Sequence, residues 1–118
     1  MYNYTGSSIY YKVTNILPIQ PYESVYILMA RAGETIIIGC GHGDDSLPQI
    51  PRVKRLLNTY SKICGLAYKD RDLYVQIAGY SHEVILTRLC GNYLNSNIVT
   101  SRITASEYSE ATSITIDS

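Results

Sequence analysis

The residues best suited to chemistry gather in one short segment, residues 39–45, whose sequence is GCGHGDD. Glycines such as Gly41 and Gly43 let the backbone adopt positive φ and let a ligand approach the main chain closely. Between them, His42 could act as a general acid or base, or position a phosphate group. A helix that begins after this segment would add unpaired N–H groups, which attract anions. The segment therefore indicates a site that binds or cleaves a nucleotide phosphodiester.

Two other interpretations of this segment stay open. His42, Asp44 and Asp45 could together hold Mg²⁺ or Mn²⁺, since these hard ions prefer oxygen ligands. Alternatively, the glycines form only a sharp turn, and the two aspartates only cap a helix and complement its dipole. The spacing matches neither a Walker loop nor a dinucleotide-binding fingerprint. We therefore predict no cofactor, with the metal ion as a minor alternative.

A second candidate is the pair His82 and Glu83, which follows Gly79 and lies at the start of a predicted helix. A glutamate at a helix N-terminus usually compensates only the helix dipole. The pair would gain a role, Glu83 in catalysis and His82 in ligand binding, if the fold brought it beside His42. We expect this if the strands at 35–39 and 72–78 run side by side and parallel. Both junctions would then share one rim of the sheet, a common location for ligands.

Basic side chains cluster after Pro51. No acidic residue interrupts residues 52–64, which contain Arg52, Lys54, Arg55 and Lys62. Arg52 and Arg55 could therefore clamp the phosphates of a ligand. The alternative is a solvated helix face whose cations lie toward the helix C-terminus. No DNA-binding motif is present, so we do not expect sequence-specific DNA recognition.

These candidates must be positioned by strands and helices. Alternating or β-branched runs predict strands at residues 8–15, 24–31, 35–39, 72–78 and 98–104. The run at 24–31 lacks polar alternation, as expected for a central strand that is covered on both faces. Residues 105–118 are predicted either as a last edge strand or as a loosely ordered tail.

Two helices are predicted from apolar residues at helical spacing. The first follows Pro48 and Pro51 and ends at Gly65, with an apolar face of Val53, Leu56, Leu57, Tyr60, Ile63 and Cys64. The second begins at Ser81, with an apolar face of Ile85, Leu86, Leu89, Cys90 and Tyr93. The predicted fold class is therefore α+β, a mostly antiparallel sheet of five or six strands with two helices packed on one face. Residues 1–118 form a single domain.

The composition excludes several protein classes. Ten Lys and Arg residues balance ten Asp and Glu residues, which argues against a histone-like nucleic-acid binder. The longest apolar run, from Val25 to Ala30, is too short to span a bilayer, and no signal pattern opens the chain. Cys40, Cys64 and Cys90 are odd in number and far apart, which indicates reduced thiols rather than a disulfide or zinc framework. We expect a cytoplasmic protein without membrane attachment.

The aromatic residues are all tyrosine, with 12 Tyr, no Phe and no Trp. Six of them fall in the first 26 residues: Tyr2, Tyr4, Tyr10, Tyr11, Tyr22 and Tyr26. Tyrosine combines apolar area with a polar tip and suits half-buried interfaces. This pattern predicts a homodimer through a Tyr-rich N-terminal strand, and with it an alternative function as a non-enzymatic viral or intracellular interaction protein. A compositional bias in which Tyr replaces Phe explains the same pattern equally well.

The order of elements resembles the small archaeal-virus proteins that act as type III anti-CRISPR ring nucleases. The resemblance rests on a hairpin at 25–38 that turns at Gly33, the Gly41-His42 pair after it, and a helix that ends in Cys64-Gly65. It implies a homodimer in the host cytoplasm that binds cyclic tetra-adenylate across the dimer axis and cleaves it without metal.

The same resemblance implies roles for two residues. His42 would be the catalytic histidine, and Glu83 would assist. The sequence departs from the family in two places. Residues 43–51 lengthen the junction and add two acids, and the arginine expected shortly before the glutamate is not evident among residues 80–82.

Overall fold

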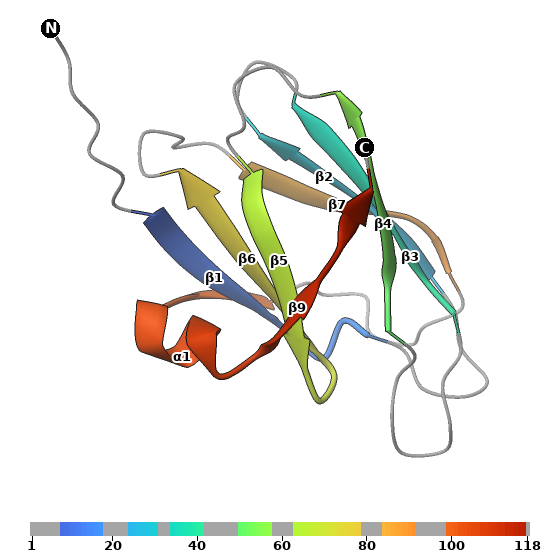
Figure 1. Ribbon diagram of the computed structural model, residues 1–118. Helices are drawn as coiled ribbons and strands as arrows, with labels where there is room; N and C mark the ends of the chain where they lie inside the picture. Colours follow the sequence, from blue (N-terminus) through green and yellow to red (C-terminus); the bar gives the residue numbers. More distant parts are fainter. Residues whose placement is uncertain are drawn as a thin grey trace, which may run out of the picture.

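The computed structural model describes residues 8–17, 24–30, 34–41, 50–57, 63–78, 84–91 and 99–117. Their strands form two five-stranded sheets that pack face to face as a β-sandwich (Figure 1). The first sheet contains, in spatial order, β8 (Val99–Ile103), β1 (Ser8–Thr14), β6 (Asp72–Ala78), β5 (Ile63–Lys69) and β9 (Thr112–Ile114). The second contains β10 (Ile116–Asp117), β4 (Arg52–Leu57), β3 (Thr35–Cys40), β2 (Ser24–Ala30) and β7 (Val84–Gly91). Neighbouring strands are antiparallel, apart from β10 and β4.

The core lies between the two sheets and is built from alternate residues of their strands. In β6, Leu73, Val75 and Ile77 point inward, as the period of two in a strand requires. In β3, Ile36 and Ile38 are fully buried and face them from the second sheet. The five strands predicted from the sequence are confirmed as β1, β2, β3, β6 and β8.

The predicted α+β fold is wrong, because both predicted helices are strands. Where the first helix was expected, the chain forms β4 and the start of β5, and these strands belong to different sheets. Of the apolar face assigned to that helix, Val53 and Ile63 are buried, whereas Leu56 and Leu57 are more than half exposed. Pairing of β4 with β3 across Ile38 and Val53 supplies backbone hydrogen bonds that a helical period in the sequence does not reveal.

The second predicted helix is β7, an eight-residue strand that pairs with β2. Its β-branched residues Val84, Ile85 and Thr87 favour an extended backbone. The apolar residues at 85, 86 and 89 fit a helical period, but they also fit a strand with apolar side chains on both faces. The expected layer of two helices on one sheet is replaced by a second sheet.

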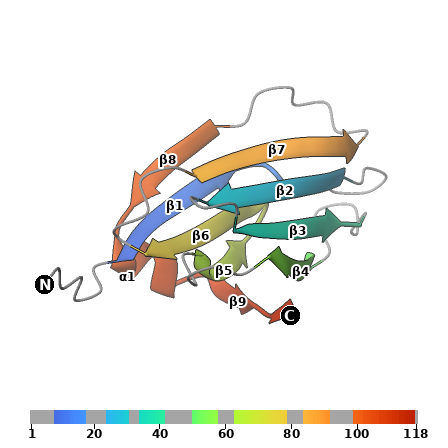
Figure 2. The same cartoon turned by 90° about the horizontal axis from the view of Figure 1, so that it is seen from above.

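The C-terminal segment ties the two sheets together. Ile114 in β9 pairs with Leu66 of β5 in the first sheet, and two residues later Ile116 in β10 pairs with Val53 of β4 in the second. Ile114 is buried and Ile116 packs against the core. One extended segment thus closes one side of the sandwich, and β7 and β8 border the other side (Figure 2).

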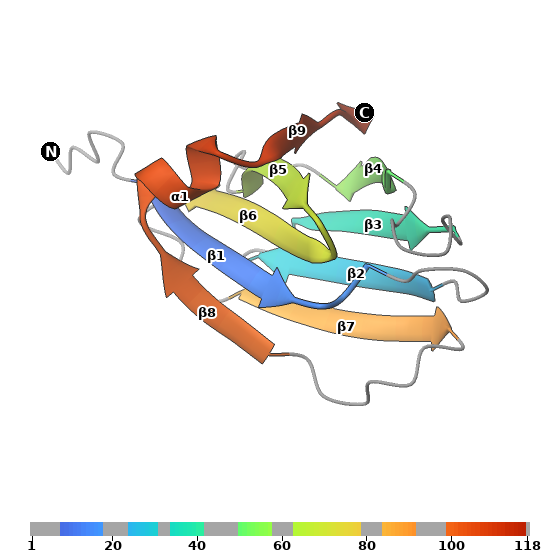
Figure 3. The same cartoon turned by 90° about the horizontal axis from the view of Figure 1, so that it is seen from below.

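The helix α1 (Ala105–Ser109) lies over the outer face of the first sheet, beside β1 and β6 (Figure 3). It begins with a capping box, in which the Thr104 hydroxyl accepts from the Glu107 N–H and the Glu107 carboxylate accepts from the Thr104 N–H. The Tyr108 ring packs on Tyr10, with centroids 5.0 Å apart. No helix in the described part of the chain has the length and apolar character that a membrane span needs.

Candidate functional site

The glycine-rich segment that the sequence singles out begins where β3 ends. Gly41 follows Cys40 directly and is half-buried. The other members of the predicted site (His42, Gly43, Asp44, Asp45, His82 and Glu83) lie outside the described residues. Ser24 is opposite Cys40 in the strand pairing, is buried, and its Oγ has no hydrogen-bond partner among the described residues. This end of the second sheet therefore retains one uncommitted hydroxyl beside the predicted site.

The strand arrangement differs from the one on which the meeting of His42 and Glu83 depended. The strands at 35–40 and 72–78 belong to different sheets, so they are not neighbours. Within the second sheet, Cys40 pairs with Ser24, whereas Val84 pairs with Ala30 at the opposite end of β2. Six residue steps along a strand span about 20 Å. The segments that carry the two candidate pairs therefore join the described sheet at opposite ends.

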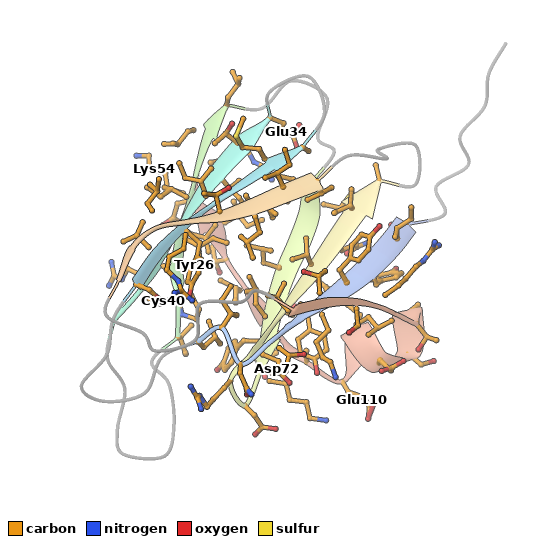
Figure 4. All side chains as sticks on the ribbon, turned by 180° about the vertical axis from the view of Figure 1, so that it is seen from behind. Tyr26, Glu34, Cys40, Lys54, Asp72 and Glu110 are labelled. Carbon is orange, nitrogen blue, oxygen red and sulfur yellow. The ribbon has the colours of Figure 1, made fainter. Side chains whose placement is uncertain are left out.

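Arg55, predicted as a ligand-binding residue, is engaged within the protein. Its Nη1 lies 3.3 Å from Oε2 of Glu34, which is completely buried at the start of β3 (Figure 4). Its Nη2 donates a hydrogen bond of 3.1 Å to the carbonyl of Ile63 in the first sheet. The Glu34 Oε2 also accepts from the Ile63 N–H at 2.6 Å. Arg55 and Glu34 thus join the two sheets, and this geometry directs Arg55 away from an external ligand.

Arg52, the other predicted phosphate ligand, points outward from β4. It is exposed, as is Lys54 two residues later on the same face of the strand. Arg52 pairs with Gly39 and Lys54 pairs with Ile37 in β3. Together, the two cations form a basic margin on the outer face of the second sheet.

The rest of that outer face is apolar. Across the strands, Ile85 of β7 is next to Met29 of β2, and Met29 is next to Thr35 of β3. Met29 is 41 % and Ile85 60 % exposed, values that are high for large apolar side chains. The next row contains Ile27 and Ile37, both half-buried. We call the outward residues Val25, Ile27, Met29, Ile37, Ile85 and Leu89 the outer apolar face.

The outer face of the first sheet is different, because the chain covers it with α1. An ideal Cβ on Gly65 would lie 2.9 Å from the Tyr108 hydroxyl, so the helix approaches the strand closely there. Ala67 and Tyr74 on this face are buried. No described residue covers the outer apolar face in the same way, and the two sheets therefore differ in what they present outward.

The tyrosines of β1 have partners within the chain. Tyr10 packs on Tyr108, and Tyr11 faces the space between the sheets. Tyr26 is completely buried, and its hydroxyl donates to the Ile16 carbonyl at 3.0 Å. The strand β1 also has neighbours on both edges, β6 and β8. These three tyrosines therefore contribute chiefly to the packing of this chain.

The two described thiols, Cys40 and Cys64, both have raised pKa values. Burial raises the pKa of the Cys40 thiol to about 12, which makes it a poor nucleophile. Burial also raises the pKa of Cys64, and the nearby Glu34 carboxylate adds to this. No cluster of three or more His, Cys, Asp or Glu side chains that could hold a metal ion occurs within the described ranges.

The side of the sandwich between β7 and β8, which we call the open side, contains a cavity of about 160 Å³. Its walls are Tyr11 and Val13 of β1, Leu28 of β2, Val75 of β6, Val84 and Leu86 of β7, and Thr100 of β8. Apart from the hydroxyl groups of Tyr11 and Thr100, these side chains are apolar. The sequence analysis missed this cavity because it assigned β7 to a helix.

Comparison of the chain with protein-family models, with curated proteins and with solved structures gave no match.

Proposed function

We propose that this chain is a non-enzymatic interaction protein that forms a homodimer through its outer apolar face. The observation that carries the proposal is the two-sided apolar character of β2. Tyr26 and Leu28 point into the core, while Val25, Ile27 and Met29 point outward. A strand of this composition is typical of a sheet covered on both faces. In the described part of one copy, only the inner face is covered.

The size of this face fits a dimer of moderate affinity. Four strands about 4.8 Å apart, with six or seven residues at about 3.3 Å each, span a flat area of roughly 400 Å². A standard interface buries about 800 Å² on each partner. The solvent-accessible area of this face is larger than its flat area, because the side chains project from the sheet. We therefore expect a reversible dimer that dissociates on dilution.

The charges on the margin favour one arrangement of the two copies. A two-fold axis that runs parallel to the strands would place β4 of one copy over β7 of the other. Lys54 would then lie level with the uncharged Thr87 of the partner copy, and neither cation would face its own copy across the interface. An axis across the strands would stack like charges, which is unfavourable. Face-to-face sheet packing with nearly aligned strands is also the usual geometry of β-sandwiches.

The test is sedimentation velocity over a concentration series. The double variant Met29→Ser/Ile85→Ser removes exposed apolar atoms without touching the core, and we expect dimerisation at least about tenfold weaker, since each buried methylene contributes about 0.8 kcal/mol. The control is Tyr10→Ala, which addresses the Tyr-rich strand instead. A wild-type chain that stays monomeric throughout would overturn the proposal. So would a dimer that Tyr10→Ala disrupts and the double variant does not.

Cleavage of a nucleotide phosphodiester stays a prediction for residues 42–45, 82 and 83. Its support is the chemistry of His42 and the basic Arg52 at the margin of the same sheet. Against it, the geometry gives Arg55 an internal partner and puts the two candidate pairs on segments that join opposite ends of the sheet. For these reasons we favour the interaction protein.

A further inference from the structure

The open side of the sandwich ends in a long edge strand, β7, whose residues are mostly apolar. At the closed side, β9 and β10 are only three and two residues long. The other edge strand of the open side, β8, carries the polar residues Thr100, Ser101 and Arg102. In contrast, β7 is eight residues long, has Arg88 as its one charged residue, with the guanidinium over the Tyr26 ring, and pairs only with β2 among the described strands. Long apolar edges of this kind readily accept a further strand.

The closed side of the same molecule indicates what kind of segment fits such a gap. There, residues 112–117 run as an extended segment along both sheets, and every second residue, Ile114 and Ile116, turns toward the core. The backbone pairs with an edge strand while the alternate side chains fill the space between the sheets. The open side presents the same two features without such a segment among the described residues: the edge of β7 and an apolar space.

The cavity on the open side has the size of one large apolar side chain. Its volume is about 160 Å³, and apolar cavities of about 150 Å³ can hold a molecule such as benzene. Val84 and Leu86 form the wall on β7, and both are only partly buried. Protein interiors are normally filled to the density of organic crystals, so an apolar space of this size at an open edge favours an apolar occupant.

The charge at the rim adds a second requirement on the occupant. In the pairing of β8 with β1, Arg102 is opposite Tyr11 and Thr100 is opposite Val13. The Arg102 side chain is exposed. Thr100 lines the cavity, so Arg102 lies two residues further along the same face of the strand. Neither β7 nor β8 contains an acidic residue. A carboxylate two positions from the apolar side chain of an incoming strand would therefore complement this rim.

We propose that the open side binds an extended segment of a partner protein by strand addition. The backbone of the segment pairs with the edge of β7 that no described strand occupies, one leucine, isoleucine or phenylalanine side chain enters the cavity, and an aspartate or glutamate two residues away faces Arg102. This site is separate from the outer apolar face, because the residues of β7 alternate. Val84 and Leu86 line the cavity, whereas Ile85 and Leu89 point outward.

The experiment uses the full chain and a labelled eight-residue peptide that alternates threonine with isoleucine and carries an aspartate at each end. We expect saturable binding by fluorescence polarisation, and slower backbone hydrogen exchange at residues 84–90 when the peptide is present. A peptide with N-methylated amides on the pairing edge should bind at least about tenfold more weakly, because it cannot form the ladder. Equal binding of both peptides would overturn strand addition.

Two variants and one control locate the binding site. Leu86→Trp fills the cavity, and we expect it to weaken binding at least about tenfold. Because that variant changes a partly buried residue, the surface variant Arg102→Glu provides a second test. It should weaken the aspartate-flanked peptide and strengthen a lysine-flanked one. Ile85→Ser, on the outward side of the same strand, should leave peptide binding unchanged.

The outcomes separate this proposal from the dimer. A monomeric chain that binds the peptide overturns the proposed dimer and supports the open-side site. A chain that dimerises but does not bind the peptide overturns the open-side site and supports the proposed dimer. If Leu86→Trp abolishes self-association while no peptide binds, a second copy occupies the open side, and the partner proposed here is wrong.

Discussion

Glu34 and Arg55, 21 positions apart in the chain, form an ion pair across the hairpin of β3 and β4, with 3.3 Å between Glu34 Oε2 and Arg55 Nη1. Both side chains also bond to the backbone of Ile63, at the first residue of β5. The pair is therefore a link between the two sheets as well as within one of them. Sequence analysis predicted Arg55 as a phosphate ligand because neither its inward orientation nor its partner is visible in the spacing.

Removal of one member of this pair should be costly. We expect Arg55→Met to lower the free energy of unfolding by about 3–5 kcal/mol, because it leaves the Glu34 carboxylate buried without its cation. The matched control is Arg52→Met, on the same strand but exposed, with an expected effect within about 0.5 kcal/mol. Urea denaturation measures both. If the two variants were equally stable, the ion pair would have no structural role.

The contact between Gly65 and Tyr108 can be tested by a double-mutant cycle. Gly65→Ala places a methyl group 2.9 Å from the Tyr108 hydroxyl and 3.2 Å from Gln76 Oε1, and we expect a loss of about 1–3 kcal/mol. Tyr108→Phe removes that hydroxyl and should restore part of the loss in the double variant. Strict additivity in thermal or urea unfolding would show that the helix does not press on Gly65.

Stability should fall at alkaline pH because of Cys40. An unfolded cysteine ionises near pH 8.5, whereas burial raises the pKa of Cys40 in the native state to about 12. Between these values the unfolded state binds fewer protons, so the free energy of unfolding decreases by up to about 1.4 kcal/mol per pH unit. Below pH 8 the thiol is protonated in both states and contributes no pH dependence.

The measurement is the slope of the unfolding free energy against pH between 8 and 11 in wild type and in Cys40→Ala. The variant should show a shallower slope, whatever constant offset the loss of the packed thiol group adds. Cys64→Ala is the control, since that residue is exposed and should change the slope less. Identical slopes in wild type and Cys40→Ala would contradict the assignment of the pH dependence to Cys40.

The turn between β5 and β6 depends on Asp70, whose φ is 55°. Aspartate tolerates this left-handed conformation better than most residues, whereas a β-branched side chain does not. We expect Asp70→Val to destabilise the protein by about 1–2 kcal/mol. Lys69→Val, one residue earlier at an exposed strand position, should be nearly neutral. A thermal-unfolding midpoint that Asp70→Val leaves unchanged would mean that the turn adopts another conformation.

The phosphodiester hypothesis has a direct assay. Incubation with cyclic and linear oligoadenylates, followed by chromatography, should give no cleavage if the protein acts only through binding, and His42→Ala should then match wild type. Cleavage by wild type that His42→Ala abolishes would return the function to the glycine-rich segment. Arg52→Ala serves as the comparison, because it removes a cation that could contact phosphate without affecting the ion pair of Arg55.

Strands with a clean alternation or a β-branched apolar run could be predicted from the sequence, whereas prediction failed where the apolar residues fit both a helical and a strand period. In β6, Leu73, Val75 and Ile77 fit only a strand. In β7, Ile85, Leu86 and Leu89 fit a helical face, and a strand that leaves Ile85 and Leu89 exposed was not expected in a chain considered by itself. The strand β4 is held extended by its pairing with β3, which the local sequence does not reveal. The apolar residues from Val53 to Ile63 have helical spacing, but Val53 lies in the second sheet and Ile63 in the first.

The candidate surface was less predictable than the fold. The one signal for it was the lack of polar alternation at 24–30, which indicated a strand covered on both faces. The covering layer expected from the sequence, two helices, is replaced by strands, and a second copy is our proposal for what covers this face. The cavity of the open side depends on β7 and β8 lying at the edges of different sheets. No local pattern carries that information.

The closure of the sandwich by residues 112–117 also constrains how the protein is made. During synthesis, β4 and β5 leave the ribosome long before the segment that joins their edges. One edge of β1 must wait for β6, and its other edge must wait for β8. Such non-local pairing is slow because long loops must close first. The nascent chain therefore exposes apolar strands until their later partners have been made.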